Sequence, residues 1–232
     1  MSSSLPVLLP VAFGIVAVVV IVLGVVAEQR RRERLMRDCL ARGWTYAAAD
    51  PALVDRWSGE PFGQGDSRQA RNVITGIAHG HPFTAFDYSY ETHSTDSKGH
   101  RSTTTHRFAV CALGLPAPLP AMEVLPESVL SRVAAAVGLG QDLELESEDF
   151  NRRFRVRTGD PKFACDVLHP RTMEYLVAAD PPAWRIDGAD MLAWSAGRIA
   201  TMGVLAATSM LVRVADGIPP FVWKDRGYDP RS

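Results

Sequence analysis

The stretch HGHPFTAFDYSYETHSTDSKGHRSTTTH, residues 79–106, decides the fold of this chain. Apolar and polar residues alternate before, within and after it, and a Gly-His pair and a Ser/Thr-rich segment interrupt the alternation. This pattern is typical of antiparallel strands joined by turns. It predicts three strands, over residues 70–79, 82–92 and 102–113. With a two-residue turn at 80–81 and a tip at 94–105, Tyr88 faces His106, and both hairpins share one apolar face.

Five of the six histidines lie in this stretch, which raises the question of a metal site. In the predicted register, His79 and His106 lie ~20 Å apart along the strands, too far to share a metal ion. His93 and His100 lie near each other at the tip, where Asp96 is the local carboxylate, but a structural zinc takes four ligands. We therefore predict no metal site, and no motif of the chain indicates a cofactor.

The tip has a second use, because seven of its twelve residues carry hydroxyl groups. An exposed, hydroxyl-rich loop could accept phosphate and recruit a protein partner. A solvated hairpin tip without a function is the alternative. The residues of this candidate loop are His93, Ser94, Thr95, Ser97, His100, Arg101, Ser102 and Thr103.

Hairpins and helices follow one another through the rest of the chain. An acidic run and the run RRFRVR predict a further hairpin, in which Glu144 faces Arg155 and Glu146 faces Arg153. Strand pairs beside helix pairs, without regular strand–helix alternation, indicate an α+β class. We expect one domain of antiparallel hairpins packed with helices over residues 44–226.

An apolar segment at the N-terminus predicts a membrane anchor. Residues 5–27 carry no charge and measure ~34 Å as a helix, enough to cross a bilayer. Residues 1–4 would form an external tail, residues 28–43 a basic juxtamembrane helix and residues 227–232 a C-terminal tail. The topogenic basic cluster consists of Arg30, Arg31, Arg32, Arg34 and Arg37.

This charge asymmetry predicts the orientation, because basic residues beside a span stay in the cytoplasm. We expect a single-pass signal-anchor protein of the plasma membrane, with its N-terminus outside and its main domain in the cytoplasm. Residues 199–216 form the closing helix. Their uncharged part, residues 199–212, suits a buried core helix better than a second membrane segment, which is the alternative.

Composition and motifs exclude several classes. A net charge of −1 gives no reason to expect a nucleic-acid partner. The cysteines, Cys39, Cys111 and Cys165, are widely separated, which argues against a disulfide framework or a thiolate zinc site. The chain has no GxSxG, phosphate-loop or HExxH motif, so the sequence indicates no catalytic residue.

The segment ESEDFNRRFRVRTGDPKFACDVLHPRTMEYL, residues 146–176, resembles a family of bacterial, membrane-anchored proteins that share a domain of unknown function. The stretches THRFAVCAL and PPFVW are similar to members from high-GC Gram-positive bacteria. The resemblance implies a single-pass protein of unknown activity, without catalytic residues to transfer. Its matching positions are Glu146, Phe150, Asn151, Phe154, Asp160, Leu168, Pro170, Arg171, Met173 and Glu174.

The sequence therefore predicts a membrane-anchored, cytosolic-facing domain that binds a partner or acts as a scaffold. Its expected partners are the lipid bilayer, through residues 5–27, an unidentified protein, and anionic lipid headgroups near the arginines. The alternative is an enzyme that acts on a membrane-proximal substrate through a site assembled from distant residues. The sequence indicates neither a ligand nor an oligomeric state.

Overall fold

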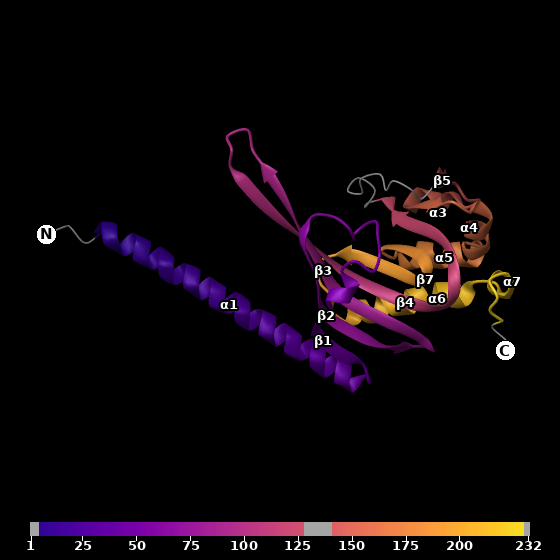
Figure 1. The fold of residues 1–232 in the computed structure, drawn as a ribbon, viewed down its shortest axis with the longest axis horizontal. Helices are drawn as coiled ribbons and strands as arrows, with labels where there is room; N and C mark the ends of the chain where they lie inside the picture. The colour runs from indigo at the N-terminus through magenta and orange to yellow at the C-terminus, as the bar shows by residue number, and fades with distance from the viewer. Residues whose placement is uncertain (1–4, 128–140, 230–232) are drawn as a thin grey trace. The chain divides into compact units, whose positions relative to one another are not determined.

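The structure is a computed structural model that describes residues 5–127 and 141–229, with the side chains of its first helix described from Val16 onward. The chain divides into two compact units, Met1–Gly43 and Trp44–Ser232. The first unit contains the helix α1 (Leu5–Ala41), and the second contains the sheet and the remaining helices (Figure 1).

The prediction that residues 5–27 cross a membrane is wrong. In the part of the chain that the structure describes, no helix is both long enough and apolar enough to span a bilayer. The single-pass topology, the plasma-membrane location and the orientation inferred from the arginines depended on this span and fall with it.

The predicted bilayer contact of residues 5–27 rested on the same span. The contact between the arginines and anionic headgroups is not tested by the fold and stays a prediction.

The second unit is built on one seven-stranded sheet in which every strand pair is antiparallel. Its strands are β1 (Thr45–Ala49), β2 (Asp66–Ala78), β3 (His81–Thr95), β4 (Arg101–Pro126), β5 (Gln141–Leu143), β6 (Phe154–Thr158) and β7 (Ala183–Ala196). The order is β1-β2-β3-β4-β6-β5. β7 pairs with the edge of β4 that lies opposite its edge with β3 and β6. Together with the helices, this sheet confirms the predicted α+β class.

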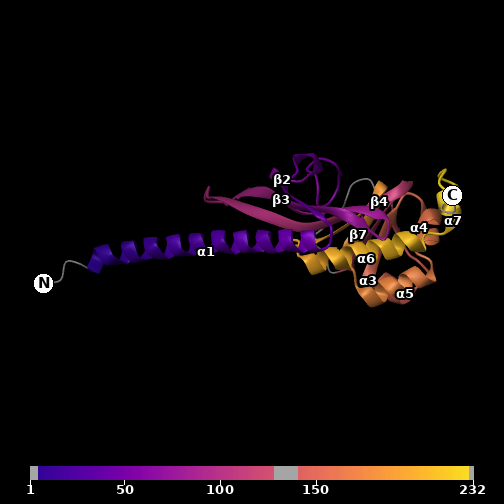
Figure 2. The ribbon, with the colours of Figure 1, turned by 90° about the horizontal axis from the view of Figure 1, so that it is seen from below.

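Helices and an irregular segment cover the two faces of the sheet (Figure 2). The helical elements are η1 (Pro51–Leu53), α3 (Glu148–Arg153), α4 (Pro161–Val167), α5 (Pro170–Ala179), α6 (Thr201–Gly217) and α7 (Pro220–Lys224). α6 crosses one face and buries Val204, Leu211 and Val214. It is therefore a core helix, as its short uncharged run predicted. Residues 50–65, which we call the covering segment, lie on the opposite face.

The covering segment closes an aromatic core. Trp57 and Phe62 from this segment pack with Phe86 and Tyr88 of β3, in one cluster with residues of β4 and β7. Gly65 ends the segment at a φ of +59°, and a Cβ there would overlap the carbonyl oxygen of Glu91. A glycine is therefore required where the segment joins β2.

The two hairpins of the opening stretch form, but near each turn the register differs from the prediction by two residues. The first turn is made by His79 and Gly80, both with positive φ, as a tight hairpin turn requires. In the second hairpin, Tyr90 rather than Tyr88 faces His106. Since the side-chain period of a strand is two, this shift leaves the side chains of the second hairpin on their predicted face. In the first hairpin, a β-bulge between Arg71 and Ile74 changes the face, so that Ala70 rather than Val73 faces Tyr88.

The hairpin before β6 keeps its predicted register but loses most of its length. β5 pairs with β6 through Asp142 and Arg157, whereas the predicted partners Glu144 and Glu146 lie outside the ladder. The helix α3 occupies the place of a short loop, because the Ser147 Oγ accepts a hydrogen bond from the Phe150 amide at 3.3 Å and caps its first turn.

Candidate functional site

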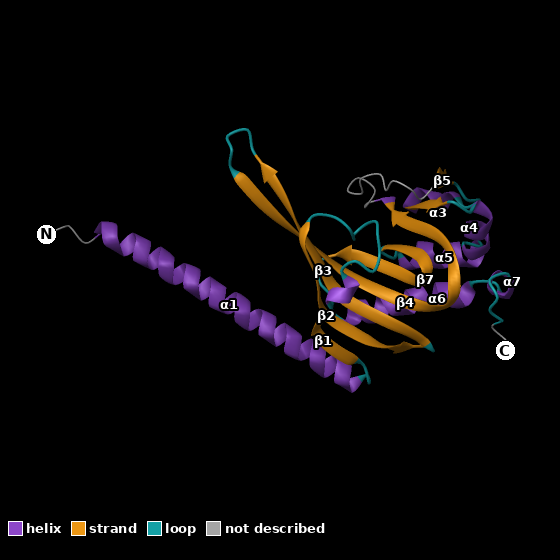
Figure 3. Cartoon of the chain, in the orientation of Figure 1, coloured by secondary structure: helices purple, strands orange, loops and turns teal. Residues whose placement is uncertain are grey.

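The hydroxyl-rich tip is an ordered hairpin end rather than a loop over residues 94–105 (Figure 3). Strands β3 and β4 run on to Thr95 and Arg101, which pair, and Ser94 pairs with Ser102. A turn over 96–100 remains. Asp96 Oδ1 accepts hydrogen bonds from the backbone amides of Lys98 and His100, and these bonds lower the pKa of the Asp96 carboxyl. The candidate hydroxyls of Ser94, Thr95, Ser102 and Thr103 therefore lie on paired strands, and Ser97 lies in the turn.

The histidines of this arm contact neighbouring side chains. His93 Nδ1 lies 3.0 Å from the Thr103 hydroxyl, and His100 Nδ1 lies 3.1 Å from Asp96 Oδ2. His106 stacks on Tyr90, with 4.7 Å between the ring centroids. Among the described residues, no three His, Cys, Asp or Glu side chains are placed to hold a metal ion.

The arginines of the predicted topogenic cluster, Arg30 to Arg37, all lie on α1. Glu28 Oε1 lies 3.5 Å from Arg31 Nη1 and 3.3 Å from Arg32 Nε, at helical spacings of three and four residues. Arg37 Nε donates to the Glu33 carbonyl oxygen at 3.4 Å. These contacts stay within the helix and add a few tenths of a kcal/mol each to its stability.

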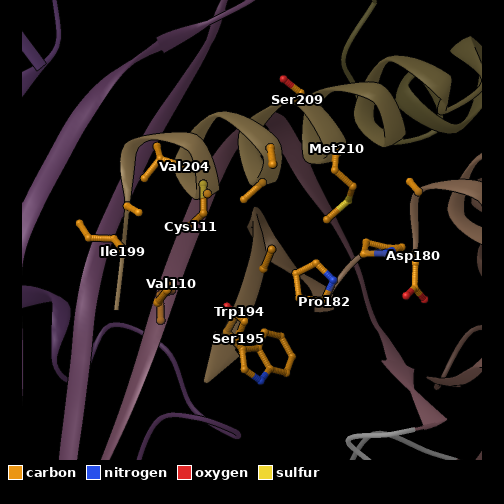
Figure 4. Close-up of a pocket in the computed structure, with 18 of the residues that line it drawn as sticks. Val110, Cys111, Asp180, Pro182, Trp194, Ser195, Ile199, Val204, Ser209 and Met210 are labelled. Carbon is orange, nitrogen blue, oxygen red and sulfur yellow. The ribbon is translucent and has the colours of Figure 1, made fainter. Parts of the chain in front are cut away.

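The main concave site of the second unit is a pocket of about 820 Å³ between α6 and the sheet, which we call the α6 pocket (Figure 4). Ala109, Cys111 and Ala193 of the central strands face α6 and form its floor. Gly203 and Ala207 are among the α6 residues that line it. Gly203 is exposed, and a Cβ built on it meets nothing within 4 Å, so a larger side chain has room there.

Polar groups lie at the edges of the α6 pocket. Arg198 lines the pocket beside Ile199, and Figure 4 shows Ile199 near one end of the cavity and Asp180 near the other, with the Ser209 hydroxyl directed away from it. The Trp194 indole points to the opposite face of the sheet. The rest of the lining consists mostly of alanine, glycine, proline, valine and methionine residues, so the site suits a mainly apolar ligand.

The Cys111 thiol points into the α6 pocket but is not a nucleophile. It is buried, and burial raises its pKa to about 12. Since the thiolate is the reactive form, only about one part in 10⁵ is reactive at pH 7. Cys111 therefore acts as a small apolar lining group.

This difference in burial predicts selective alkylation. Cys165 is exposed on α4, whereas Cys111 is buried. We expect iodoacetamide at pH 7 to modify Cys165 in the folded protein and to modify Cys111 only after denaturation. Peptide mass spectrometry after a timed reaction reports both sites. Equal labelling of the two cysteines in the folded protein would contradict this account of the pocket floor.

A smaller cavity of about 270 Å³ lies between the start of α5 and the end of α6, and we call it the basic pocket. Its lining residues include His169, Arg171, Tyr175, Arg213 and Asp216. Tyr175 lines both this cavity and the α6 pocket.

A cluster of charged residues is buried on the other face of the sheet. Glu123 of β4 lies between Arg157 of β6 and Arg185 of β7 in the strand ladder. The side chains of Glu123 and Arg185 are almost fully buried, with residue exposures of 1% and 3%. Glu123 Oε2 lies 3.8 Å from Arg157 Nη1, an ion-pair distance. No substrate can reach a carboxylate at this depth, so the cluster is structural.

Arg185 ties the covering segment to this cluster. Its guanidinium donates to the backbone carbonyl oxygens of Ser58 at 2.6 Å and Glu60 at 3.2 Å, and it forms an ion pair with Asp187 at 3.2 Å. Burial raises the pKa of the Glu123 carboxyl, although both arginines oppose the shift. Burial and the nearby Glu123 also raise the pKa of Glu60.

The raised pKa of Glu60 predicts a pH-dependent contribution to stability. The pKa of a glutamate in an unfolded chain is about 4.3. The contribution of Glu60 is therefore complete below that pH and is lost as the pH rises through the higher folded pKa. Glu60→Gln removes the titrating group and therefore the loss of stability that its ionisation causes. The difference in unfolding free energy between this variant and the wild type is expected to rise between about pH 4 and pH 7 in urea titrations. A difference that falls with pH would contradict the direction of the shift.

Comparisons with known proteins extend only to the fold. No family model matches the chain, and no curated protein matches it. The chain is similar to the crystal structure of the mycobacterial trehalose monomycolate transport factor A, TtfA, with a TM-score of 0.52 and 16% sequence identity. The match covers 81% of this chain and 90% of that one. At this identity the match shows a shared fold, and the resemblance to a bacterial family of unknown function stays a prediction.

Sequence reasoning did not identify either pocket. The α6 pocket depends on small residues at helical spacing, Gly203, Ala206 and Ala207, on a helix that was assigned to the core as a whole. This spacing places them on one face of α6 and is the signal that could have indicated a gap. The basic pocket joins the beginning of one helix to the end of another, which requires the tertiary structure.

Proposed function

We propose that this protein is a binding protein, that its ligand site is the α6 pocket, and that the ligand contributes an apolar chain. The observation that supports this proposal is the cavity of about 820 Å³ with a wall of small apolar side chains. Ligand pockets of proteins fall in a range of about 300–1,000 Å³ and are mostly apolar.

The groups that line the α6 pocket favour binding over catalysis. The Cys111 thiol is protonated at neutral pH, and Asp180 is exposed at one end of the cavity. A general base or nucleophile would need to face a reacting atom within hydrogen-bond distance. The enzyme alternative has no such pair of groups among the described residues that line this pocket.

The structural neighbour is consistent with a role without catalysis. TtfA is named as a factor in the transport of trehalose monomycolate, which is a statement about that protein. For this chain, the shared fold supports only the coarser proposal of a binding or scaffolding part within a larger process. The protein partner expected from the sequence remains part of that proposal.

Filling the pocket tests the proposal. We would titrate the full chain with Nile red, an uncharged apolar dye, and displace the dye with 1-dodecanol below its solubility limit. Gly203→Leu adds a branched side chain where a Cβ has open space, so the variant is expected to fold. Because the new side chain occupies the cavity, both ligands are expected to bind about tenfold more weakly or not at all.

Met202→Leu is the matched control, because Met202 lies on the same helix with 73% of its surface exposed. This variant is expected to bind both ligands as the wild type does. Thermal unfolding of both variants verifies the fold. The proposal is wrong if the wild type does not bind Nile red, or if a folded Gly203→Leu protein binds it as tightly as the wild type.

A further inference from the structure

We infer that the ligand of the α6 pocket is an anionic amphiphile, whose single apolar chain lies in the α6 pocket and whose carboxylate or phosphate head lies in the basic pocket. This inference rests on the proposed function and specifies the chemical class of the ligand. Three observations carry it: the succession of the two pockets along α5 and α6, the change of their lining from mostly apolar to cationic, and two arginines that form no ion pair with a carboxylate among the described residues.

One face of α6 lines both pockets. Gly203, Ala207 and Met210 face the α6 pocket, and Arg213 and Gly217 face the basic pocket. These positions are three or four residues apart, so they form a continuous stripe along the helix. At 1.5 Å per residue, the stripe is ~21 Å long. The two cavities therefore follow one another along the same face of α6.

The helix α5 shows the same progression on the other wall of the groove. Ala179 lines the α6 pocket, Tyr175 lines both pockets, and Arg171 lines the basic pocket. These residues are again four apart along one helix face. The Arg213 guanidinium lies 5.6 Å from the centroid of the Tyr175 ring, so an arginine of α6 contacts the aromatic residue at which the lining changes.

The basic pocket has an excess of positive charge. Arg171 and Arg213 form no ion pair with a carboxylate among the residues that the structure describes, in contrast to Arg155, Arg157 and Arg185. Asp216 is the acidic residue of the lining, and its carboxylate lies 3.3 Å from His81 Nε2.

The remaining polar groups of the basic pocket hold its two helices together. His169 Nε2 lies 3.1 Å from the Gly217 carbonyl oxygen and 3.2 Å from the Thr172 hydroxyl. These contacts join the beginning of α5 to the end of α6. The two guanidinium groups are therefore the lining groups that can donate to an anion, and guanidinium geometry fits carboxylate and phosphate oxygens.

The combination of these linings selects a class of ligand. A chain without a charge would fill only the α6 pocket, and a small anion without a chain would contact only the arginines. An amphiphile uses both, and each methylene buried in the α6 pocket should strengthen binding about fourfold. The anionic head should add about another tenfold through charge-assisted hydrogen bonds.

The test compares ligands that share one chain. Nile red bound to the full-length protein is displaced with 1-dodecanol, dodecanoate or dodecyl phosphate, each below its critical micelle concentration, and with inorganic phosphate. We expect the two anionic ligands to bind about tenfold more tightly than the alcohol, with a preference that shrinks at high salt. The affinities of octyl, decyl and dodecyl phosphate should differ by about fourfold for each methylene group. Inorganic phosphate should neither displace the dye nor compete with dodecyl phosphate at comparable concentrations.

The double variant Arg171→Gln/Arg213→Gln separates head from chain. It is expected to lose the tenfold preference for the anionic ligands and to retain the dodecanol affinity of the wild type. Arg152→Gln is the control, because Arg152 is an exposed arginine of α3 that lines neither pocket, and it should retain the preference.

The outcomes distinguish this inference from the proposed function. Equal affinity for dodecanol and dodecyl phosphate, or a preference that survives in the double variant, overturns the anionic head and leaves the apolar site intact. Competition by inorganic phosphate at the concentrations that suffice for dodecyl phosphate overturns the amphiphile in favour of a free-phosphate site. Failure of every chain to displace the dye overturns the proposed function itself.

Discussion

The free energy of unfolding of the Arg185→Met variant is expected to be about 3–5 kcal/mol lower than that of the wild type. The substitution removes a buried cation that compensates Glu123 and donates to the carbonyl oxygens of Ser58 and Glu60. The carboxylate then keeps only Arg157 as a cationic partner, and both carbonyl oxygens lose their donor away from water, which costs more than the interaction contributes when intact. Urea unfolding monitored by tryptophan fluorescence measures the loss.

Two further variants make the assignment specific. Arg152→Met removes an exposed arginine whose partner Asp149 is also exposed, so we expect a change of about 0–1 kcal/mol. Adding Glu123→Gln to Arg185→Met removes the buried carboxylate that has lost one of its two arginines and should restore part of the stability. A loss of less than about 1 kcal/mol in Arg185→Met would show that the cluster does not anchor the covering segment.

The Phe62→Ala variant is expected to lose a similar amount, about 3–5 kcal/mol, because it removes a buried aromatic ring and leaves a cavity. Phe62 is 1% exposed, and its ring centroid lies 4.8 Å from that of Tyr88 and 5.4 Å from that of Trp57. The Arg185 guanidinium lies 5.8 Å from the same ring. The substitution therefore weakens the attachment of the covering segment to the sheet.

Phe221→Ala is the matched control, since Phe221 of α7 is 48% exposed, and its loss should stay near 0.5 kcal/mol. Hydrogen exchange adds a local measurement. In Phe62→Ala, amides of the covering segment should exchange faster than those of β4, because the segment is held by this ring and by Arg185. Similar stability losses in the two phenylalanine variants would contradict the assigned role of the aromatic core.

The elements that local patterns determine were predicted correctly from the sequence. Alternation in β2, β3 and β4 indicated antiparallel hairpins, and prolines at 161 and 170 mark the beginnings of α4 and α5. The exact register was not predictable, because moving a turn by one residue shifts a hairpin by two residues and leaves the apolar face unchanged. The second hairpin differs in this way, whereas the first also carries a β-bulge between Arg71 and Ile74 that no local pattern indicated.

Other features depended on contacts between distant residues. The short helix α3 replaced a predicted strand pair because Ser147 and Asn151 satisfy backbone groups locally, with Asn151 bonded to Leu145 at both its amide and its carbonyl. The membrane prediction for residues 5–27 is wrong, because no helix among the described residues is long and apolar enough to span a bilayer. Both pockets require helices α5 and α6 to be placed side by side, which no local pattern encodes.

Photolabelling tests the central claim, an apolar chain in the α6 pocket, most directly. Dodecyl phosphate with a diazirine at the end of its chain would be bound to the full-length protein, irradiated, and located by peptide mass spectrometry. We predict label on α6 between Gly203 and Met210 or on the facing strand near Ala193, with the label lost in Gly203→Leu. Label concentrated on the covering segment, or label on α6 that persists unchanged in Gly203→Leu, would contradict the account.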